Sequence, residues 1–489
     1  MTGKKRPTLL HAFIPIISLI VLLFVNVIIF GTGDPNHPSK IAATDGPNQI
    51  ALFLAAAVAG LISWRLGYNW EQIEVSIVKS ISSAMGAMLI LLVIGSLSGT
   101  WLLSGIVPAM IYYGLKILNP TFFLFAACIV CCVVSLATGS SWSTIATVGI
   151  ALLGIGKTLG IHEGLVAGTI ISGAYFGDKM SPLSDTTNLA PAMAGTDLFT
   201  HIRYMVFTTA PTLAITLLIF FIWGFTIDTS GATNTEGVLH AIDGAFNLNP
   251  ILFVVPALVL FMIVRKVPAI PALLVGSVLG GIFGVIFQPQ IVDQISEVVN
   301  DPTKSAFIAV MKSMASSINI KTENAMISEL LSSGGMAGML NTIWLILGAM
   351  IFGGVMESSG LLMRIVEGII KWAHSTGSLV LSTAVTSIFF NCTAGDQYMA
   401  IAIPGRMFAD TYRKQGYKPE LLSRTLEDAG TVTSVLVPWN TCGATQSKVL
   451  GISTWTYAPY CFFCIISPCM TVLQAYLNFK IRRLNDKAS

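Results

Sequence analysis

The chain has 489 residues, of which 54% are hydrophobic and only 10% are charged. Soluble domains carry about 25% charged residues, so this composition excludes a soluble globular protein. The formal net charge is +3, and the sequence has no basic tract with interleaved aromatic residues, which argues against a nucleic-acid partner. The structural unit to look for is therefore a membrane span of ~20 apolar residues.

Apolar segments follow one another along the whole chain. The first lies after Lys4, Lys5 and Arg6, and it is too long for a signal-peptide core, so we expect a retained membrane helix. The sequence predicts fourteen membrane segments, seven in each half. The first half has segments at 9–30, 49–66, 84–104, 120–138, 142–156, 163–177 and 204–225. The second half has them at 249–264, 268–288, 337–357, 378–394, 396–410, 423–440 and 455–479.

Matching residues recur at a constant distance in the two halves. The pairs, 255 or 256 residues apart, are Gly99 with Gly354, Gly105 with Gly360, Gly139 with Gly395, and Pro182 with Pro438. Because these pairs fall in apolar segments that also align, the sequence predicts an internal repeat. We expect a first membrane repeat at 1–230, an external linker at 231–248, and a second repeat at 249–489 with an external insertion at 289–336.

Loop charges predict the orientation of the chain in the membrane. Both ends of the chain are basic, so both termini should be cytoplasmic and the number of crossings even. The basic residues at the two ends are Lys4, Lys5, Arg6, Lys480, Arg482, Arg483 and Lys487. The acidic loop 226–248 should be external, and the basic loop 411–424 internal. Because each half has an odd number of crossings, the repeats should be inverted. The pairs 120–156 and 378–410 are alternatively re-entrant hairpins, which leaves the parity unchanged.

The densest polar cluster interrupts an apolar stretch at residues 177–188. Pro182 removes a backbone donor there and prevents a continuous helix. The freed carbonyls join hydroxyl, amide and carboxylate oxygens, which suit a hard cation such as Na+. An ordinary Ser/Thr-rich loop is the alternative, but residues 438–443 break the second half in the same way. Short, interrupted segments at matching places in two halves are typical of a transporter's binding site.

The two breaks supply the candidate cation and proton ligands. We expect Asp178 and Asp185 to be the leading carboxylates, and Na+ to lie at Asp178, Asp185, Ser184 and Asn440. Neutral oxygens would come from Ser184, Thr186, Asn440 and Thr441, because the repeat sets Asn440 opposite Ser184 and Thr441 opposite Asp185. Lys179 would pair with a carboxylate when the cation is absent.

Further carboxylates lie within or beside apolar segments, where each costs ~3 kcal/mol at mid-membrane. The four acids are Glu357, Asp396, Glu427 and Asp428. They are candidates for the proton path or for coupling, with an interfacial or helix-capping role as the alternative. The eight cysteines and six histidines show no metal-ligand framework, and no nucleophile–base set is present in the sequence. We therefore expect neither an enzyme nor a cofactor.

The first break reads Gly177-Asp178-Lys179-Met180-Ser181-Pro182-Leu183-Ser184-Asp185-Thr186-Thr187-Asn188. Together with Pro438-Trp439-Asn440, it resembles the NhaC-type Na+/H+ antiporter family, and the similarity covers nearly the whole chain. The resemblance implies a carrier of the bacterial inner membrane that exports Na+ in exchange for protons. It also implies an alternative, since some relatives exchange organic acids, such as malate for lactate, with Na+ and H+ moving alongside.

The sequence therefore predicts an all-α polytopic membrane protein with two inverted repeats and broken helices or re-entrant hairpins. Our first hypothesis is a Na+/H+ antiporter with the lipid bilayer, Na+ and H+ as its partners. The second is an organic-acid exchanger, although no arginine is obviously placed mid-membrane to hold a dianion. An ion channel is a third hypothesis from another class, and inverted repeats with broken helices favour a carrier over it. The sequence leaves open whether the protein forms a homodimer.

Overall fold

The computed structural model describes residues 5–30, 43, 45–117, 119–227, 235–298, 301–320 and 331–484. Parts of the sequence-based predictions lie outside the described residues: Lys4, Lys487, and the stretches 228–234, 299–300 and 321–330.

Helices make up nearly all of the regular structure, as the composition predicts. The first half contains α1 (Leu9–Phe30), α2 (Pro47–Arg65), α3 (Trp70–Leu103), α4 (Ile106–Ile117), α5 (Pro120–Thr138), α6 (Ser141–Thr144), the π-helix η1 (Ile145–Gly149), α7 (Ile150–Thr158), α8 (Glu163–Met180), α9 (Asp185–Ala194) and α10 (Leu198–Gly224). Between the halves lies α11 (Thr235–Ala245).

The second half begins with the 3-10 turn η3 (Pro250–Phe253), α12 (Val254–Val264), α13 (Ala269–Phe287), α14 (Pro289–Ser296) and α15 (Pro302–Ala315). It continues with the strands β1 (Ile318–Asn319) and β2 (Ser332–Ser333), which pair antiparallel, and with η4 (Ala337–Met339), α17 (Leu340–Ser358), α18 (Leu361–Ile370), α19 (Thr376–Thr393) and α20 (Gln397–Lys414). The chain ends with α21 (Pro419–Leu426), the π-helix η5 (Glu427–Thr431), η6 (Ser434–Leu436), α22 (Thr441–Leu450), α23 (Thr454–Tyr457), η7 (Ala458–Tyr460) and α24 (Phe462–Tyr476).

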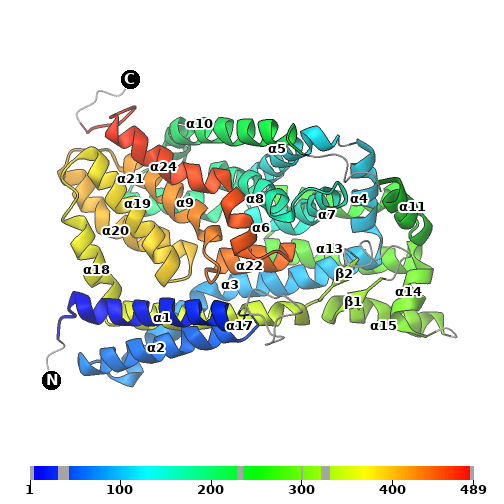
Figure 1. The fold of residues 1–489 in the computed structure, drawn as a ribbon, viewed down its shortest axis with the longest axis horizontal. Helices are drawn as coiled ribbons and strands as arrows, with labels where there is room; N and C mark the ends of the chain where they lie inside the picture. The colour runs from blue at the N-terminus through cyan, green and yellow to red at the C-terminus, as the bar shows by residue number, and fades with distance from the viewer. Residues whose placement is uncertain are drawn as a thin grey trace.

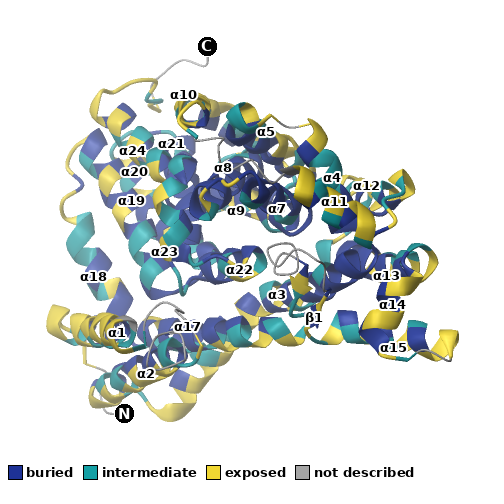
Figure 2. Cartoon of the chain, turned by 45° about the vertical axis from the view of Figure 1, so that its right-hand side comes forward, coloured by how far each residue is buried: buried dark blue, intermediate teal, exposed yellow. Residues whose placement is uncertain are grey.

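The long helices α3 and α17 lie side by side and run antiparallel (Figure 1). Small residues permit their close approach, because a Cβ on Gly95 would overlap the carbonyl of Gly335 just before α17. At the other end, a Cβ on Gly354 would lie 3.0 Å from the Ser76 carbonyl oxygen. Helix α2 packs along α17 and α13 packs along α3, so each long helix has an apolar companion. Figure 2 shows exposed residues on α1 and α2 and buried residues around α7, α8 and α22.

Seven of the described helices are long and apolar enough to cross a membrane: α1, α2, α3, α5, α10, α13 and η4 with α17. Two bent pairs, α11 with η3–α12 and α23–η7 with α24, raise this number to at most nine. The protein is therefore an all-α polytopic membrane protein, but this number is smaller than the fourteen segments that the sequence predicts. Several predicted segments are divided, since α6, η1 and α7 share 142–156, and η5 and η6 interrupt 423–440.

A helical hairpin with a glycine at its tip occurs in each half. Gly139 after α5 and Gly395 after α19 have φ values of 71° and 67°, a left-handed conformation that favours glycine. The next residues, Ser140 and Asp396, are the N-caps of α6 and α20. Space is also limited at the first tip, because a Cβ on Gly139 would lie 2.6 Å from the Leu183 Cβ. The first hairpin tip thus packs against the first break.

The two breaks have matching backbone conformations as well. Ser184 has φ −73° and ψ 137° and caps α9, while Asn440 has φ −71° and ψ 146° and caps α22. Both half-helices then end at a left-handed glycine, Gly195 with φ 85° and Gly451 with φ 68°. The proline-containing breaks that the sequence predicts are therefore present, and the residues set opposite one another by the repeat occupy the same capping position.

The predicted linker differs from the structure in one respect. Residues 231–248 were expected to form a loop, yet α11 occupies Thr235–Ala245 within it. Val238, Ile242 and Phe246 follow one another at intervals of four, so they share one helical face, and all three are buried in the core. This apolar stripe explains the helix. The predicted insertion at 289–336 contains α14 and α15 together with the small β-sheet.

Candidate functional site

A cavity of about 680 Å³ lies beside the middle of α3, where the two halves meet. Its walls come from α3, the tip of the first hairpin, the first break, the α12–α13 turn, and the first turns of α20 and α22. Five residues predicted as ligands face this one cavity: Asp178, Ser184, Asp185, Thr186 and Thr441. The structure therefore brings together oxygen-bearing side chains from both breaks.

Asp178 is the buried carboxylate of the cavity wall, at 8% exposed. It lies at the end of α8 and accepts two hydrogen bonds from Ser141, at 3.1 Å from the backbone nitrogen and 2.6 Å from Oγ. Ser141 is the first residue of α6, so the carboxylate faces the positive end of a short helix. These donors stabilise the charged form of Asp178. Sequence reasoning missed Ser141, although its place after the capping residue Ser140 was a signal.

Asp185 lies in a more open environment than Asp178. It is the first residue of α9, it is exposed to the cavity, and no hydrogen bond to its carboxylate occurs among the described residues. The structure therefore places this carboxylate on the open wall of the cavity. Its neighbours Ser184 and Thr186 are buried, and their hydroxyl oxygens lie 3.1 Å apart.

The second break contributes less to the cavity than predicted. Thr441 lines it, but the Asn440 side chain is directed to other partners: Nδ2 donates to the carbonyl and side-chain oxygens of Asn391, both at 3.1 Å. Its Oδ1 accepts from the Cys442 nitrogen at 3.0 Å. Asn440 thus joins the second break to α19. Asp396 is 1% exposed and caps α20, with the Met399 nitrogen 3.0 Å from its Oδ1.

An ion pair inside the protein connects the halves. Lys179, next to Asp178 in the sequence, donates to Asp428 of η5, and both side chains are completely buried. Ser467 and Thr208 also donate to the same Asp428 oxygen, at 3.2 and 3.3 Å. The structure therefore identifies the carboxylate that partners Lys179. Because a buried charge is costly without a partner, this pair holds the end of α8 against η5.

The two remaining acids lie in very different places. Glu427 is completely buried next to Asp428, and both of its carboxylate oxygens lack a hydrogen-bond partner among the described residues. Glu357 is exposed at the end of α17 and does not line the cavity. The interfacial interpretation therefore fits Glu357, and the structure does not bring it to the site.

A cation in the cavity wall was missed by sequence reasoning. Lys266 lies in the α12–α13 turn with φ 65°, is exposed, and lines the same cavity as the carboxylates of the first break. No ion pair involving Lys266 occurs among the described residues. Its position was a weak signal in the sequence, since Arg265 and Lys266 separate two apolar segments as a loop does.

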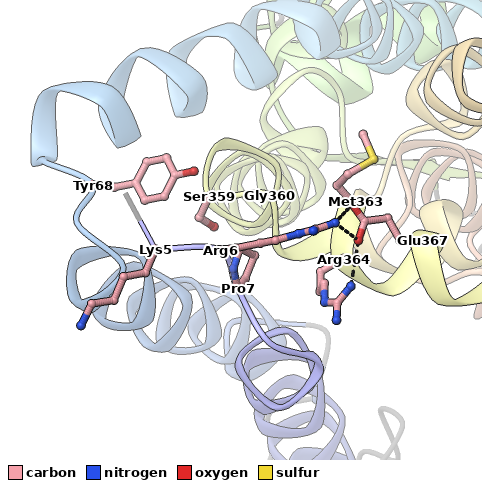
Figure 3. Close-up of a pocket in the computed structure, with 9 residues that line it drawn as sticks. All are labelled: Lys5, Arg6, Pro7, Tyr68, Ser359, Gly360, Met363, Arg364 and Glu367. Carbon is pink, nitrogen blue, oxygen red and sulfur yellow. Dashed lines mark hydrogen bonds and ion pairs between the residues drawn. The ribbon is translucent and has the colours of Figure 1, made fainter. Parts of the chain in front are cut away.

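A second, smaller hollow of about 280 Å³ lies where α1 begins and α2 ends (Figure 3). Arg6 donates to both Glu367 carboxylate oxygens at 2.8 Å, and Arg364 donates to one at 2.9 Å. Arg364 and Arg6 together hold the pKa of Glu367 below its usual range. This group lies outside the membrane spans, and it ties the segment before α1 to α18.

These features define a class of protein. A membrane protein with broken helices, half-helix caps and carboxylates facing a central cavity has the features of a secondary transporter. The Na+/H+ antiporter family matches residues 173–479. The Na+/H+ antiporter NhaC of Alkalihalophilus pseudofirmus is 35% identical over 90% of this chain and 92% of its own length.

Two proteins of Bacillus subtilis are similarly related. Its Na+/H+ antiporter NhaC is 35% identical, over 88% of this chain and 92% of the relative. Its malate-2H+/Na+-lactate antiporter is 34% identical, over 93% of this chain and 94% of the relative. The chain belongs to the Na+/H+ antiporter family. These relatives are transporters and not enzymes.

Proposed function

We propose that the protein exchanges Na+ for H+ across the bacterial inner membrane, with both termini in the cytoplasm. The observation that carries this proposal is the shared cavity, which Asp178 and Asp185 of the first break face together with Thr441 of the second. Carboxylate and hydroxyl oxygens are the ligands that a hard cation such as Na+ prefers. Transport of this kind needs no cofactor.

The carboxylates give a simple basis for exchange. Na+ enters the cavity at the exposed Asp185 and is then bound by Asp178, with Ser184, Thr186 and Thr441 as neutral ligands. A proton neutralises the same carboxylates, so the two ions compete. The adjacent Lys179 does not repel the cation strongly, because Asp428 compensates its charge. Exchange follows if the site changes its access from one side of the membrane to the other more readily when it is loaded than when it is empty and charged.

We further propose that the halves are inverted repeats that contribute fourteen segments, including re-entrant ones. The antiparallel pairing of α3 with α17 supports the inversion, because these are the helices that the repeat sets opposite each other. A two-fold axis in the membrane plane would relate equivalent helices in this antiparallel way. Such a carrier could act as a monomer or as a homodimer, and its transport cycle requires only one cavity per chain.

The direct test uses Asp185→Asn in proteoliposomes that report internal pH when Na+ is added. The amide keeps the size of the side chain but has no charge and does not titrate as a carboxyl group does, so we expect Na+-driven proton movement to be abolished. Asp410→Asn is a matched control, since the Asp410 side chain is 80% exposed and pairs only weakly with Arg413 at 3.7 Å. Exchange by Asp185→Asn at the wild-type rate would reduce Asp185 to a structural residue of the break.

An organic-acid exchanger is the second candidate function. Two observations favour it: the cavity of about 680 Å³ is large enough for a small metabolite, and Lys266 supplies a positive charge to its wall. The similarity to a malate/lactate antiporter agrees with it. Adding malate and lactate to the same vesicles, with wild type and Lys266→Gln, separates the two functions. A metabolite exchanger would respond to both acids and lose that response in Lys266→Gln, whereas a pure Na+/H+ exchanger would not respond.

A further inference from the structure

A second polar region lies inside the protein, away from the cavity walls. It begins on α21 and η5, where Glu420, Arg424, Glu427 and Thr431 follow at intervals of three and four residues and therefore share one helical face. All four are buried. A polar face on a buried helix of a membrane protein requires an explanation, because such groups are costly in an apolar surrounding.

Helix α10 meets this face with polar groups of its own. The His201 Nδ1 forms a 2.7 Å hydrogen bond with the Ser423 hydroxyl. Tyr204 lies one turn further along α10, and the Arg424 guanidinium of α21 lies over its ring, 4.6 Å from the ring centre. The contacts show that α10 turns a polar side toward α21 and η5.

Helix α24 closes the third side. Gln474 accepts a long hydrogen bond of 3.5 Å from Arg424, and Ser467 donates to Asp428 at 3.2 Å. Thr471 lies between them on the same face of α24, because it follows Ser467 by four residues. We call the polar groups enclosed by α10, α21 with η5, and α24 the polar tract.

Many polar atoms of this tract have no hydrogen-bond partner in the part of the chain that the structure describes. Among the described residues, eighteen buried side-chain atoms lack a hydrogen bond, and nine of them belong to α10, α21, η5 and α24. They include both oxygens of Glu427, two nitrogens of Arg424 and the hydroxyl of Thr471. Buried polar groups are nearly always satisfied, and where protein groups do not satisfy them, ordered water does. The concentration of unpartnered atoms in one place therefore indicates a hydrated tract.

We propose that the polar tract is a water-filled route for the exchanged proton, separate from the cavity that binds Na+. The inference rests on the proposed Na+/H+ exchange. Glu427 holds the proton at the inner end, beside the Lys179–Asp428 pair that adjoins Asp178. On release, the Glu427 carboxyl gives its proton to a water molecule, and the charge moves along hydrogen-bonded waters.

The end of the route that reaches the protein surface is at Glu420. This residue is 5% exposed and pairs at 3.2 Å with Arg482, whose side chain is 38% exposed. Glu420 and Asp428 are eight residues apart on a continuous helical path, which corresponds to ~12 Å. A file of a few waters spans this distance. The route thus reaches the surface beneath the C-terminal segment, next to the loop expected to be cytoplasmic.

Two transport modes of the reconstituted protein test the proposal. Exchange of ²²Na+ for Na+ at constant pH needs the cavity but no proton route, whereas Na+-driven proton movement needs both. We expect Glu427→Gln to keep Na+/Na+ exchange and to slow Na+/H+ exchange roughly 100-fold, the contribution typical of a positioned proton-transfer group. Loss of both modes to the same extent would place Glu427 in the Na+ site and overturn the proposal.

A second variant keeps the test decisive if Glu427→Gln fails to fold. Thr471→Val removes a hydroxyl that contacts only water in our proposal, so proton movement should slow roughly tenfold while Na+/Na+ exchange persists. Thr216→Val on α10 is the control, because its hydroxyl donates to the Thr212 carbonyl at 2.8 Å and lies outside the tract. If Thr471→Val exchanges Na+ for H+ as fast as Thr216→Val, the tract is dry and the proposal is wrong. A wild-type protein without any Na+-driven proton movement would refute the proposed function itself.

Discussion

Removing the cation of the buried Lys179–Asp428 pair provides a stringent test of the structure. Both side chains are 0% exposed, so Lys179→Met leaves the Asp428 carboxylate in the interior without its ion partner. Breaking a buried pair in this way costs ~3–5 kcal/mol. The Ser467 and Thr208 hydroxyls remain within 3.3 Å of the carboxylate and offset part of this cost, so we expect ~3 kcal/mol.

Lys179→Met and the added Asp428→Leu should change the stability in opposite directions. Replacing both partners, in Lys179→Met/Asp428→Leu, removes the two charges together and should restore most of the stability, because a well-packed apolar pair is often neutral or stabilising. Lys157→Met is the matched control. Its partner Glu163 lies 2.9 Å away, but the two side chains are 30% and 45% exposed, so the expected loss is ~0–1 kcal/mol.

Denaturant unfolding of the purified protein in detergent, followed by tryptophan fluorescence, gives the three free-energy differences. The midpoint should fall clearly for Lys179→Met, recover for the double variant, and barely change for Lys157→Met. Equal midpoints for Lys179→Met and Lys157→Met would mean that the hydroxyls and ordered water around Asp428 compensate its charge fully without the lysine, which would refute the cost assigned to breaking the pair. A double variant less stable than Lys179→Met would show that Asp428 stabilises the fold even without the lysine, which would contradict the cost assigned to its unpaired charge.

Two further predictions concern other parts of the fold. The folded-state pKa of Glu367 is lowered, so its contribution to stability is present at neutral pH and is lost as the pH falls through that lowered value. The difference in melting temperature between wild type and Glu367→Gln should therefore shrink on acidification, and a difference independent of pH would contradict the ion-pair explanation. Gly99→Ala should destabilise the protein by ~1–3 kcal/mol, because its Cβ would overlap the Ser313 carbonyl. Gly60→Ala, with open space around it, should instead stabilise by ~0.5–1 kcal/mol, and equal effects of the two changes would argue against tight α3–α15 packing.

Local features of the sequence predicted the breaks and the hairpin tips well. Pro182 cannot continue a helix, and a glycine at 139 and again at 395 fits a left-handed turn in each half. Five of the predicted ligands face one cavity, because a capping residue and the first turn after it are fixed by local chemistry. Glu357 shows the limit of this reasoning, since an acid at the end of an apolar run has the same sequence signal whether it faces a cavity or the solvent.

Long-range contacts could not be derived in the same way. The partner of Lys179 is 249 residues away, and several acids of the second half were equally plausible from the sequence. Ser141 carries no charge, and its place after Ser140 does not say which carboxylate it would meet, so the geometry of α6 against α8 is needed to identify it as the donor to Asp178. The direction of the Asn440 amide toward Asn391 depends on how α19 packs, which residue types alone do not determine.

The ion pair between the halves also has a consequence for how the protein is made. Lys179 leaves the ribosome 249 residues before Asp428. At ~5–20 residues per second, the lysine exists for ~12–50 s before its partner has been synthesised. During that time an ammonium group cannot settle in the hydrocarbon core, so the end of α8 must remain in water, at the lipid headgroups or beside the insertion machinery. The last part of the first half therefore reaches its final position only after η5 has been synthesised, which makes assembly of the core a late step in the production of the chain.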